Sequence, residues 1–287
     1  MKSEDPMPMN PDPILSAYLH HWGARAIPFS NAPDETLFLT PAAEQALGLL
    51  QQTAALRSVM VLAGANGVGK SALVAHWVER LEPKTFRPIV ITQATLSASG
   101  LLCTLLSKIG QTPKNRRSVN LVLLEEALRQ LDRLLPVLVL DEAQVYRPGS
   151  LEEIRLLLGL NLPRRPVFAL ILVGDTYFLD ALRLQSQRAL YSRISAAFSL
   201  PPLDRQQVAL YLDHALHQVG IDRPCFEPAT LDLLAAASEG LPRTLNLLAR
   251  MAWIEASRDK AAAITPAHLQ PALRLVPSAS DKIMPPR

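Results

Sequence analysis

Long hydrophobic runs, aromatic side chains and cysteines are all scarce in this sequence of 287 residues. Its longest apolar runs, 137–140 and 167–173, are of strand length, far below the roughly 20 residues that a membrane helix needs. No positively charged and then apolar leader opens the chain, so we expect a cytoplasmic protein without a membrane segment. The two cysteines, Cys103 and Cys225, lie far apart in apolar surroundings, and we expect them to be reduced packing residues.

The composition is that of an ordered globular protein. Hydrophobic residues make up 49% of the chain and charged residues 19%, which argues against disorder. Because aromatic residues make up only 5%, the core must consist mainly of leucine, valine, isoleucine and alanine. The net charge of +3 and the pI of about 9.0 permit contact with nucleic acid but do not establish it.

The order of predicted elements divides the chain into two domains. Apolar strands are expected at 58–63, 88–92, 137–140, 167–173 and 196–200, with helices between them. Strands that are apolar throughout and alternate with helices indicate a parallel sheet covered on both faces. After Pro202 only helices are expected, at 205–219, 227–238, 242–258 and 266–275. We therefore predict an N-terminal tail over 1–17, an α/β nucleotide-binding domain over 18–202, a helical lid over 203–275 and a C-terminal tail over 276–287.

The strongest motif is a complete G-x-x-x-x-G-K-[ST] between the first predicted strand and a helix. Its residues are Gly64, Ala65, Asn66, Gly67, Val68, Gly69, Lys70 and Ser71. In such a loop the glycines allow successive backbone N–H groups to converge on phosphates. Lys70 is placed to reach the β- and γ-phosphates, and the Ser71 hydroxyl is placed to ligate Mg²⁺. The motif predicts ATP and Mg²⁺ as cofactors.

The third predicted strand ends in two acidic residues. Asp141 is expected to hold Mg²⁺ through water, and Glu142 to polarise the water that attacks ATP. A strand followed by an ordinary solvated acidic turn would give the same pattern. The extra strand at 88–92, between the P-loop strand and the acidic strand in the sequence, favours the catalytic interpretation. We expect the acidic strand to lie beside the P-loop strand in the sheet.

Three arginines are candidates for contact with the triphosphate. Arg243 follows Gly-Leu-Pro at the start of a helix in the lid, where a cation would meet the γ-phosphate. Arg188 and Arg193 lie just before the fifth strand, and one of them, supplied by a neighbouring subunit, would stabilise charge on the transferred phosphoryl group. We favour Arg193 over Arg188, although either position is also compatible with a surface charge.

The fourth predicted strand ends at a position where a polar side chain would orient the attacking water. The residues there are Asp175 and Thr176. A carboxylate that faces a triphosphate is electrostatically unfavourable, so the role of this position stays open.

Together these motifs resemble the AAA+ ATPases, and within them the ExeA-like group, which is related to the transposition ATPases TnsC, TniB, MuB and IstB. The resemblance covers about residues 18–270 and is carried by 22–29 with 37–41, 140–144 with 151–155, and 240–248. It implies a three-layer P-loop core with a five-stranded parallel sheet, followed by the small helical lid. It also implies that Pro28 and Phe29 lie near the adenine, that Arg243 is the sensor of the lid and that Arg193 is the arginine finger. Asp175 departs from the uncharged polar residue that is common in the family.

The resemblance implies two different tasks. ATPases of mobile elements polymerise on duplex DNA with ATP and recruit a transposase, so the expected partners are copies of the chain itself in a ring or helical, hexamer-like assembly, double-stranded DNA and a transposase. Secretion or cell-envelope ATPases of the ExeA type, which continue into a transmembrane helix, are the alternative, and an ATP-switched scaffold without DNA is a third. We favour transposition, because the sequence contains no such helix.

The basic residues between two predicted helices are the candidate DNA contacts. They are Lys114, Arg116 and Arg117, with Arg147, Arg164 and Arg165 as the next candidates. Cations on one exposed surface bind phosphates irrespective of base sequence. A solvated basic loop would look the same in the sequence.

Overall fold

The computed structural model describes residues 13–30, 36–92, 96–131, 134–159 and 166–276. Within it the chain forms two compact units: residues 33–201, and residues 1–32 together with 202–287. The first is the α/β unit, and the second is the helical unit. The two units divide between Pro201 and Pro202, whereas the sequence analysis places its boundary after Pro202.

The α/β unit is built on one five-stranded parallel sheet. Its strands are β1 (Val59–Gly64), β2 (Phe86–Ile91), β3 (Leu135–Leu140), β4 (Ala169–Val173) and β5 (Ala196–Leu200). They lie in the order β2-β3-β4-β1-β5, and every neighbouring pair is parallel. The predicted five-stranded parallel sheet is confirmed. The three central strands are buried almost throughout, which explains their continuous apolar sequences.

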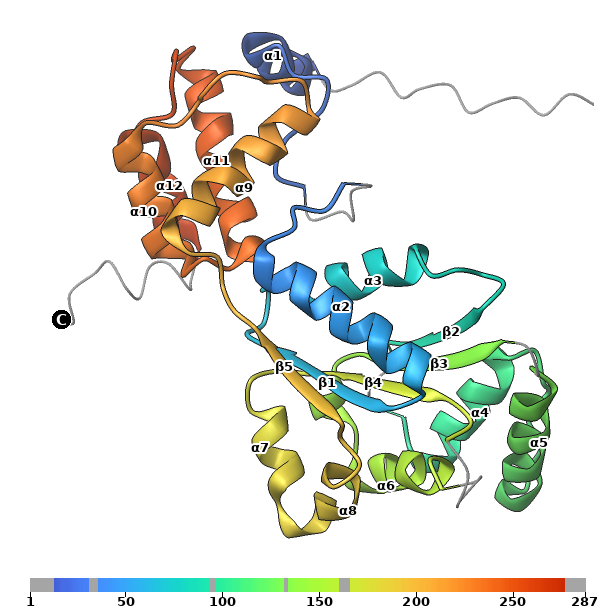
Figure 1. The fold of residues 1–287 in the computed structure, drawn as a ribbon. Coiled ribbons are helices and arrows are strands. Elements are labelled where there is room, and N and C mark those ends of the chain that lie inside the picture. Colours follow the sequence, from blue (N-terminus) through green and yellow to red (C-terminus); the bar gives the residue numbers. More distant parts are fainter. Residues whose placement is uncertain (1–12, 31–35, 93–95, 132–133, 160–165, 277–287) are drawn as a thin grey trace, which may run out of the picture. The chain divides into compact units, whose positions relative to one another are not determined.

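Helices cover both faces of this sheet (Figure 1). On one face lie α2 (Pro41–Leu56) and α3 (Lys70–Glu79), and on the other lie α4 (Ala98–Lys108), α6 (Pro148–Leu157) and α7 (Phe178–Arg183). Alternate residues of a strand point to opposite faces, so Val59 and Val61 join the core beneath α4, α6 and α7. The unit also contains α5 (Arg117–Gln130), α8 (Arg188–Tyr191) and two 3₁₀ turns, η1 (Ala143–Val145) and η2 (Gln185–Gln187).

The sheet order corrects one expectation about the acidic strand. We expected β3 to lie beside β1, but β1 pairs with β4 and β5, while β3 pairs with β2 and β4. Strand β4 is therefore inserted between the P-loop strand and the acidic strand. The separation leaves the carboxyl end of β4, with Asp175, between the phosphate loop and the acidic pair.

The helical unit contains α1 (Pro13–Trp22), α9 (Arg205–Gln218), α10 (Pro228–Ser238), α11 (Pro242–Arg258) and α12 (Pro266–Leu275). Helix α9 begins with a capping box, in which the Asp204 carboxylate accepts from Gln207 N and the Gln207 side chain accepts from Asp204 N. The core of this unit gathers around Trp253, which is fully buried on α11. Cys225 is buried here as a free thiol, and burial raises its pKa.

The N-terminal segment differs from the sequence expectation. Residues 13–17 were assigned to a tail and residues 18–32 to the α/β domain, whereas the structure begins a helix at Pro13 and groups the segment with the helical unit. Trp22 explains this placement: its indole N–H donates to Ser257 Oγ over 2.6 Å, and its ring stacks on Trp253 with centroids 6.1 Å apart. The aromatic contacts bury a large apolar area and anchor α1 to α11. The residues expected to form the C-terminal tail, apart from Val276, lie outside the described residues.

Among the described residues, no helix combines the length and the apolar character that crossing a bilayer requires.

Candidate nucleotide site

The predicted phosphate-binding loop joins β1 to α3 and has the backbone geometry that its glycines permit. Gly64 has φ 156°, and a side-chain carbon there would lie only 2.9 Å from Leu200 O on the adjacent strand. Gly69 precedes α3 with φ 104°, a conformation that side chains strongly disfavour. Because α3 begins directly at Lys70, no preceding helical turn supplies acceptors for the N–H groups of its first turn, a geometry that suits an anion at this end of the helix.

Lys70 is held inside the curve of this loop. Its side chain is almost entirely buried, at 7% exposure, and its ammonium donates to Gly64 O over 2.8 Å and to Ala65 O over 3.1 Å. A buried ammonium is stable only with such acceptors around it. The loop therefore holds a fixed positive charge at the place where the sequence predicts the phosphates.

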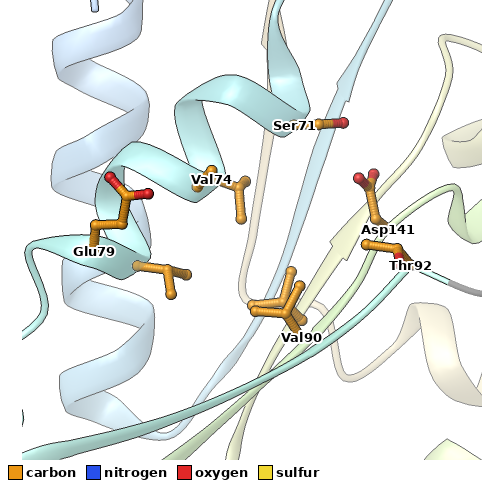
Figure 2. Close-up of a pocket in the computed structure, with 9 residues that line it drawn as sticks. Ser71, Val74, Glu79, Val90, Thr92 and Asp141 are labelled. Atoms are coloured by element: carbon orange, nitrogen blue, oxygen red, sulfur yellow. The ribbon is translucent and has the colours of Figure 1, made fainter. Parts of the chain in front are cut away.

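Ser71 and Asp141 open onto one pocket of about 260 Å³ between α3 and the β2–β3 edge of the sheet. Figure 2 shows both side chains at the same end of this pocket, with Thr92 beside Asp141. The rest of its wall is mainly apolar and includes Val74, Val90 and Val139. The fold thus brings together the two residues predicted to serve Mg²⁺, although 70 positions of sequence separate them.

These two side chains suit a magnesium ion that is shared with a nucleotide. Hydroxyl and carboxylate oxygens are the donors that Mg²⁺ prefers, and the ion commonly takes one or two protein ligands with phosphate oxygens and water. Within the described part of the chain, no group of three or more histidine, cysteine, aspartate or glutamate residues is placed to hold a metal. The hydroxyl and carboxylate of Ser71 and Asp141 fit a Mg²⁺ ion that is bound together with a nucleotide.

Glu142 lies at the turn after β3 and is linked to the end of β4 by Gln144. The backbone of Glu142 has φ 51°, which is unusual for a residue with a side chain, and its side chain is exposed. Its Oε2 accepts a hydrogen bond from Gln144 Nε2 over 2.7 Å. Gln144 Oε1 in turn accepts from the backbone N–H of Asp175 over 3.3 Å. Sequence reasoning noted Gln144 only as part of a family pattern and gave it no role.

The Asp175 carboxylate is used locally. Its Oδ1 accepts from the backbone N–H of Tyr177 over 3.0 Å, which closes the turn before α7. This contact gives an acidic residue at the end of β4 a structural task. The predicted role of Asp175 or Thr176 in orienting water stays a prediction.

Tyr146 is a buried polar residue near the site that sequence reasoning missed. Its side chain is 4% exposed, and its hydroxyl makes no hydrogen bond to any described residue. Burial raises the pKa of Tyr146 to about 12, and the nearby Asp141 carboxylate adds to the rise. The phenol therefore stays protonated near neutral pH. An aromatic residue six positions after the strand was the only available signal.

The two arginines before β5 differ in their surroundings. Arg193 is partly buried, and its Nη1 donates to the carbonyl oxygen of Arg155, at the C-terminal part of α6, over 3.2 Å. Arg188 is exposed at the first residue of α8. Both lie in the α/β unit, and the structure of one chain leaves the predicted finger role of Arg193 a prediction.

Three further predicted nucleotide residues belong to the helical unit. Pro28 and Phe29 are buried there, and the Phe29 ring packs edge to face against Phe226 with centroids 5.9 Å apart. Arg243 is exposed in the first turn of α11. Gly240, which opens the same motif, must lack a side chain for a steric reason. A side-chain carbon there would lie 1.9 Å from Leu203 O. The roles of these residues toward ATP stay predictions.

The three basic candidates near the start of α5 have different surroundings in the structure. Lys114 and Arg116 are exposed, whereas Arg117 forms an ion pair with the buried Glu153 of α6, Nη2 to Oε2 over 2.6 Å. Removing one partner of a buried pair leaves an uncompensated charge, so Arg117 contributes to the stability of the fold. Arg147 is exposed, and Arg164 and Arg165 lie outside the described residues.

Comparison with known proteins agrees with the fold and the loop. Residues 54–182 match the family described as "AAA domain". Cdc6p from Pyrobaculum aerophilum superposes with a TM-score of 0.67 at 21% identity, over 86% of this chain and 69% of that one. The ORC2 protein of Aeropyrum pernix, solved as ADPNP–ADP complexes, superposes with a TM-score of 0.62 at 16% identity, over 90% of this chain and 72% of that one. The chain thus has the fold of the AAA+ ATPases, and the match over residues 54–182 supports an ATP-hydrolysing P-loop ATPase.

Within this class, one curated protein shows similarity in sequence. General secretion pathway protein A of Aeromonas hydrophila is 30% identical over 251 residues, which make up 83% of this chain and 45% of that protein. The chain therefore spans less than half the length of this relative. The predicted AAA+ fold and ATPase class are confirmed, and the likeness to an ExeA-type protein is found.

Proposed function

We propose that the α/β unit binds ATP with Mg²⁺ and that Glu142 acts as the base for its hydrolysis. The observation that carries this proposal is the meeting of Ser71 and Asp141 at one pocket, next to the loop that holds Lys70. The N–H groups of the loop and the Lys70 ammonium bind the phosphates, and Ser71 and Asp141 hold the ion. Bound Mg²⁺ supplies charge compensation at the phosphate oxygens. Glu142 accepts a proton from the attacking water.

We further propose that copies of the chain complete each other's sites. Arg193 precedes β5 in the α/β unit, and an arginine that enters a neighbour's site would stabilise the charge on the transferred phosphoryl group. Its hydrogen bond to the Arg155 carbonyl oxygen holds it in the isolated chain and would be exchanged on assembly. We therefore expect the chain to form oligomers when ATP is bound.

Mixing experiments test this shared site. Arg193→Ala and Lys70→Ala proteins, each nearly inactive alone, are expected to regain part of the ATPase activity when mixed, because some interfaces then combine an intact loop with an intact arginine. Specific activity of the unmodified protein is expected to rise with protein concentration. Arg188→Ala is the matched control and should retain activity. A monomer whose specific activity is independent of concentration contradicts the proposal, and loss of activity in Arg188→Ala instead of Arg193→Ala assigns the role to Arg188.

For the cellular task, we favour ATP-driven assembly of a secretion or cell-envelope complex. The supporting observation is the identity of 30% with general secretion pathway protein A, over most of the present chain. Because the chain spans 45% of that protein, we propose for this chain only a part of such a task. The comparison thus favours the reading that the sequence treated as the alternative.

The second candidate is an ATP-dependent oligomer on duplex DNA that recruits a transposase. The observation that favours it is the exposure of Lys114 and Arg116 in the segment that joins α4 to α5. Exposed cations bind DNA phosphates without sequence preference, and such binding falls steeply with salt.

Fluorescence anisotropy of a labelled duplex separates the two tasks. On the DNA reading, binding requires ATP, and Lys114→Ala/Arg116→Ala lowers affinity and reduces the salt slope by about two, at roughly 0.9 for each phosphate contact. Arg117 is left intact, because its loss would leave the Glu153 carboxylate buried without its partner. Lys84→Ala/Arg87→Ala is the matched control, because it removes two exposed cations at the start of β2, outside the candidate DNA-binding segment. No binding at low salt in any nucleotide state removes the DNA reading and leaves the secretion reading.

A further inference from the structure

One side chain beside the proposed catalytic residues makes contacts to which the proposed function assigns no role. Gln144 lies in the middle of η1, between the ends of β3 and β4. The short helix is anchored by its neighbours, because Ala143 is fully buried and Tyr146 is 4% exposed. Glu142 and Gln144 project from this anchored turn and are bonded to each other.

The two ends of the Gln144 amide meet groups of opposite hydrogen-bonding character. Its Nε2 donates to the Glu142 carboxylate over 2.7 Å, and its Oε1 accepts from Asp175 N–H over 3.3 Å. A carboxylate only accepts and a backbone N–H only donates. A primary amide satisfies both, and its nitrogen and oxygen are fixed by these two partners.

This bridge joins the ends of two neighbouring strands, β3 and β4. Strand β4 lies between β1 and β3, so its end separates the phosphate loop from the acidic pair. Glu142 is exposed to solvent, so packing against neighbours does little to fix the direction of its carboxylate. Among the described residues, the hydrogen-bond partner of that carboxylate is the Gln144 amide.

We propose that Gln144 is a positioning residue for ATP hydrolysis, which orients the Glu142 carboxylate by tying it to the backbone at the end of β4. The inference rests on the proposed role of Glu142 as the base. A charge-assisted hydrogen bond is short and directional, and it holds the carboxylate in one orientation before water is bound. The same bridge makes the direction of the base depend on the position of Asp175 N–H.

Kinetics of two Gln144 variants test the proposal. Gln144→Glu keeps the size of the side chain but loses the donor to Glu142, and Gln144→Ala removes the bridge. Both are expected to lower kcat by about 10- to 100-fold with KM for ATP within about twofold of the unmodified protein, because the base loses its orientation and the phosphate loop is unchanged. Gln52→Glu, the same change of charge at an exposed glutamine of α2, is the matched control and should leave kcat unchanged.

A double variant shows whether Gln144 acts through Glu142. Adding Gln144→Glu to Glu142→Gln should produce no further loss in single-turnover hydrolysis, because the group that Gln144 orients is already gone. Unchanged kcat in both single variants overturns the inference, and so does a rise in KM without a fall in kcat. If Glu142→Gln itself hydrolyses ATP at the unmodified rate, the assignment of the base fails. If that variant is inactive while the Gln144 variants are fully active, only the present inference fails. The isosteric Gln144→Glu keeps the test valid if Gln144→Ala lowers the melting temperature.

Discussion

Glu142→Gln is expected to lower ATP turnover by about 10²- to 10⁴-fold while ATP binding is retained. The amide has the size of the carboxylate but cannot accept the proton of the attacking water at neutral pH. Glu142 lies outside the proposed phosphate loop and is hydrogen-bonded to Gln144, whereas Lys70 is held by Gly64 and Ala65, so replacing Glu142 is expected to leave the binding groups in place. Phosphate release under saturating ATP and titration with a fluorescent ATP analogue measure the two effects separately.

Glu126→Gln is the matched control, because it makes the same chemical change at an exposed glutamate of α5. It should retain the turnover of the unmodified protein. Hydrolysis by Glu142→Gln at the unmodified rate would transfer the role of the base to another group.

Lys70→Ala is expected to weaken ATP binding by about 10- to 100-fold, which corresponds to the loss of one hydrogen bond between charged groups of about 1.5–3 kcal/mol. The ammonium is 7% exposed and already lies within the loop, so its charge acts at short range with little screening by water. The measurement is calorimetric titration with ATP, ADP and AMP.

The dependence on phosphate number separates this electrostatic effect from damage to the loop. Since the lysine of such a loop reaches the β- and γ-phosphates, the loss should be large for ATP and small for AMP. Lys84→Ala, at an exposed lysine before β2, should leave all three affinities unchanged. An equal loss for ATP and AMP would show instead that Lys70 chiefly holds the loop together through Gly64 and Ala65.

The phosphate loop and the acidic pair could be read directly from the sequence because each is a local pattern. Gly64 to Ser71 carry their own turn geometry in three glycines, and Asp141 and Glu142 follow a strand that is apolar throughout. Elements with strong periodicity, such as α10 and α11, were predicted at nearly the observed positions for the same reason. Asp204 and Gln207 supply the capping box at the start of α9, where the sequence predicted that the helices of the lid begin.

The position of the acidic strand could not be read in this way. Parallel strands pair through backbone groups that all residues carry, so the side chains of β1 and β3 do not specify their neighbours. We expected β3 beside β1, and the structure places β4 between them. This single insertion gives Asp175 its position beside the acidic pair, where its backbone N–H donates to Gln144.

The sequence by itself determined the class of the protein, the phosphate loop and the two acidic residues, because nearby residues carry that chemistry. Only the tertiary structure decided that Trp22 joins the helical unit through Trp253, that Arg117 is engaged by Glu153 and that Gln144 connects Glu142 to β4. The first two of these contacts join residues far apart in the chain, and the bridge depends on which strands are neighbours. The energy that selects such contacts comes from burial and pairing in the folded chain, and local sequence patterns do not record it.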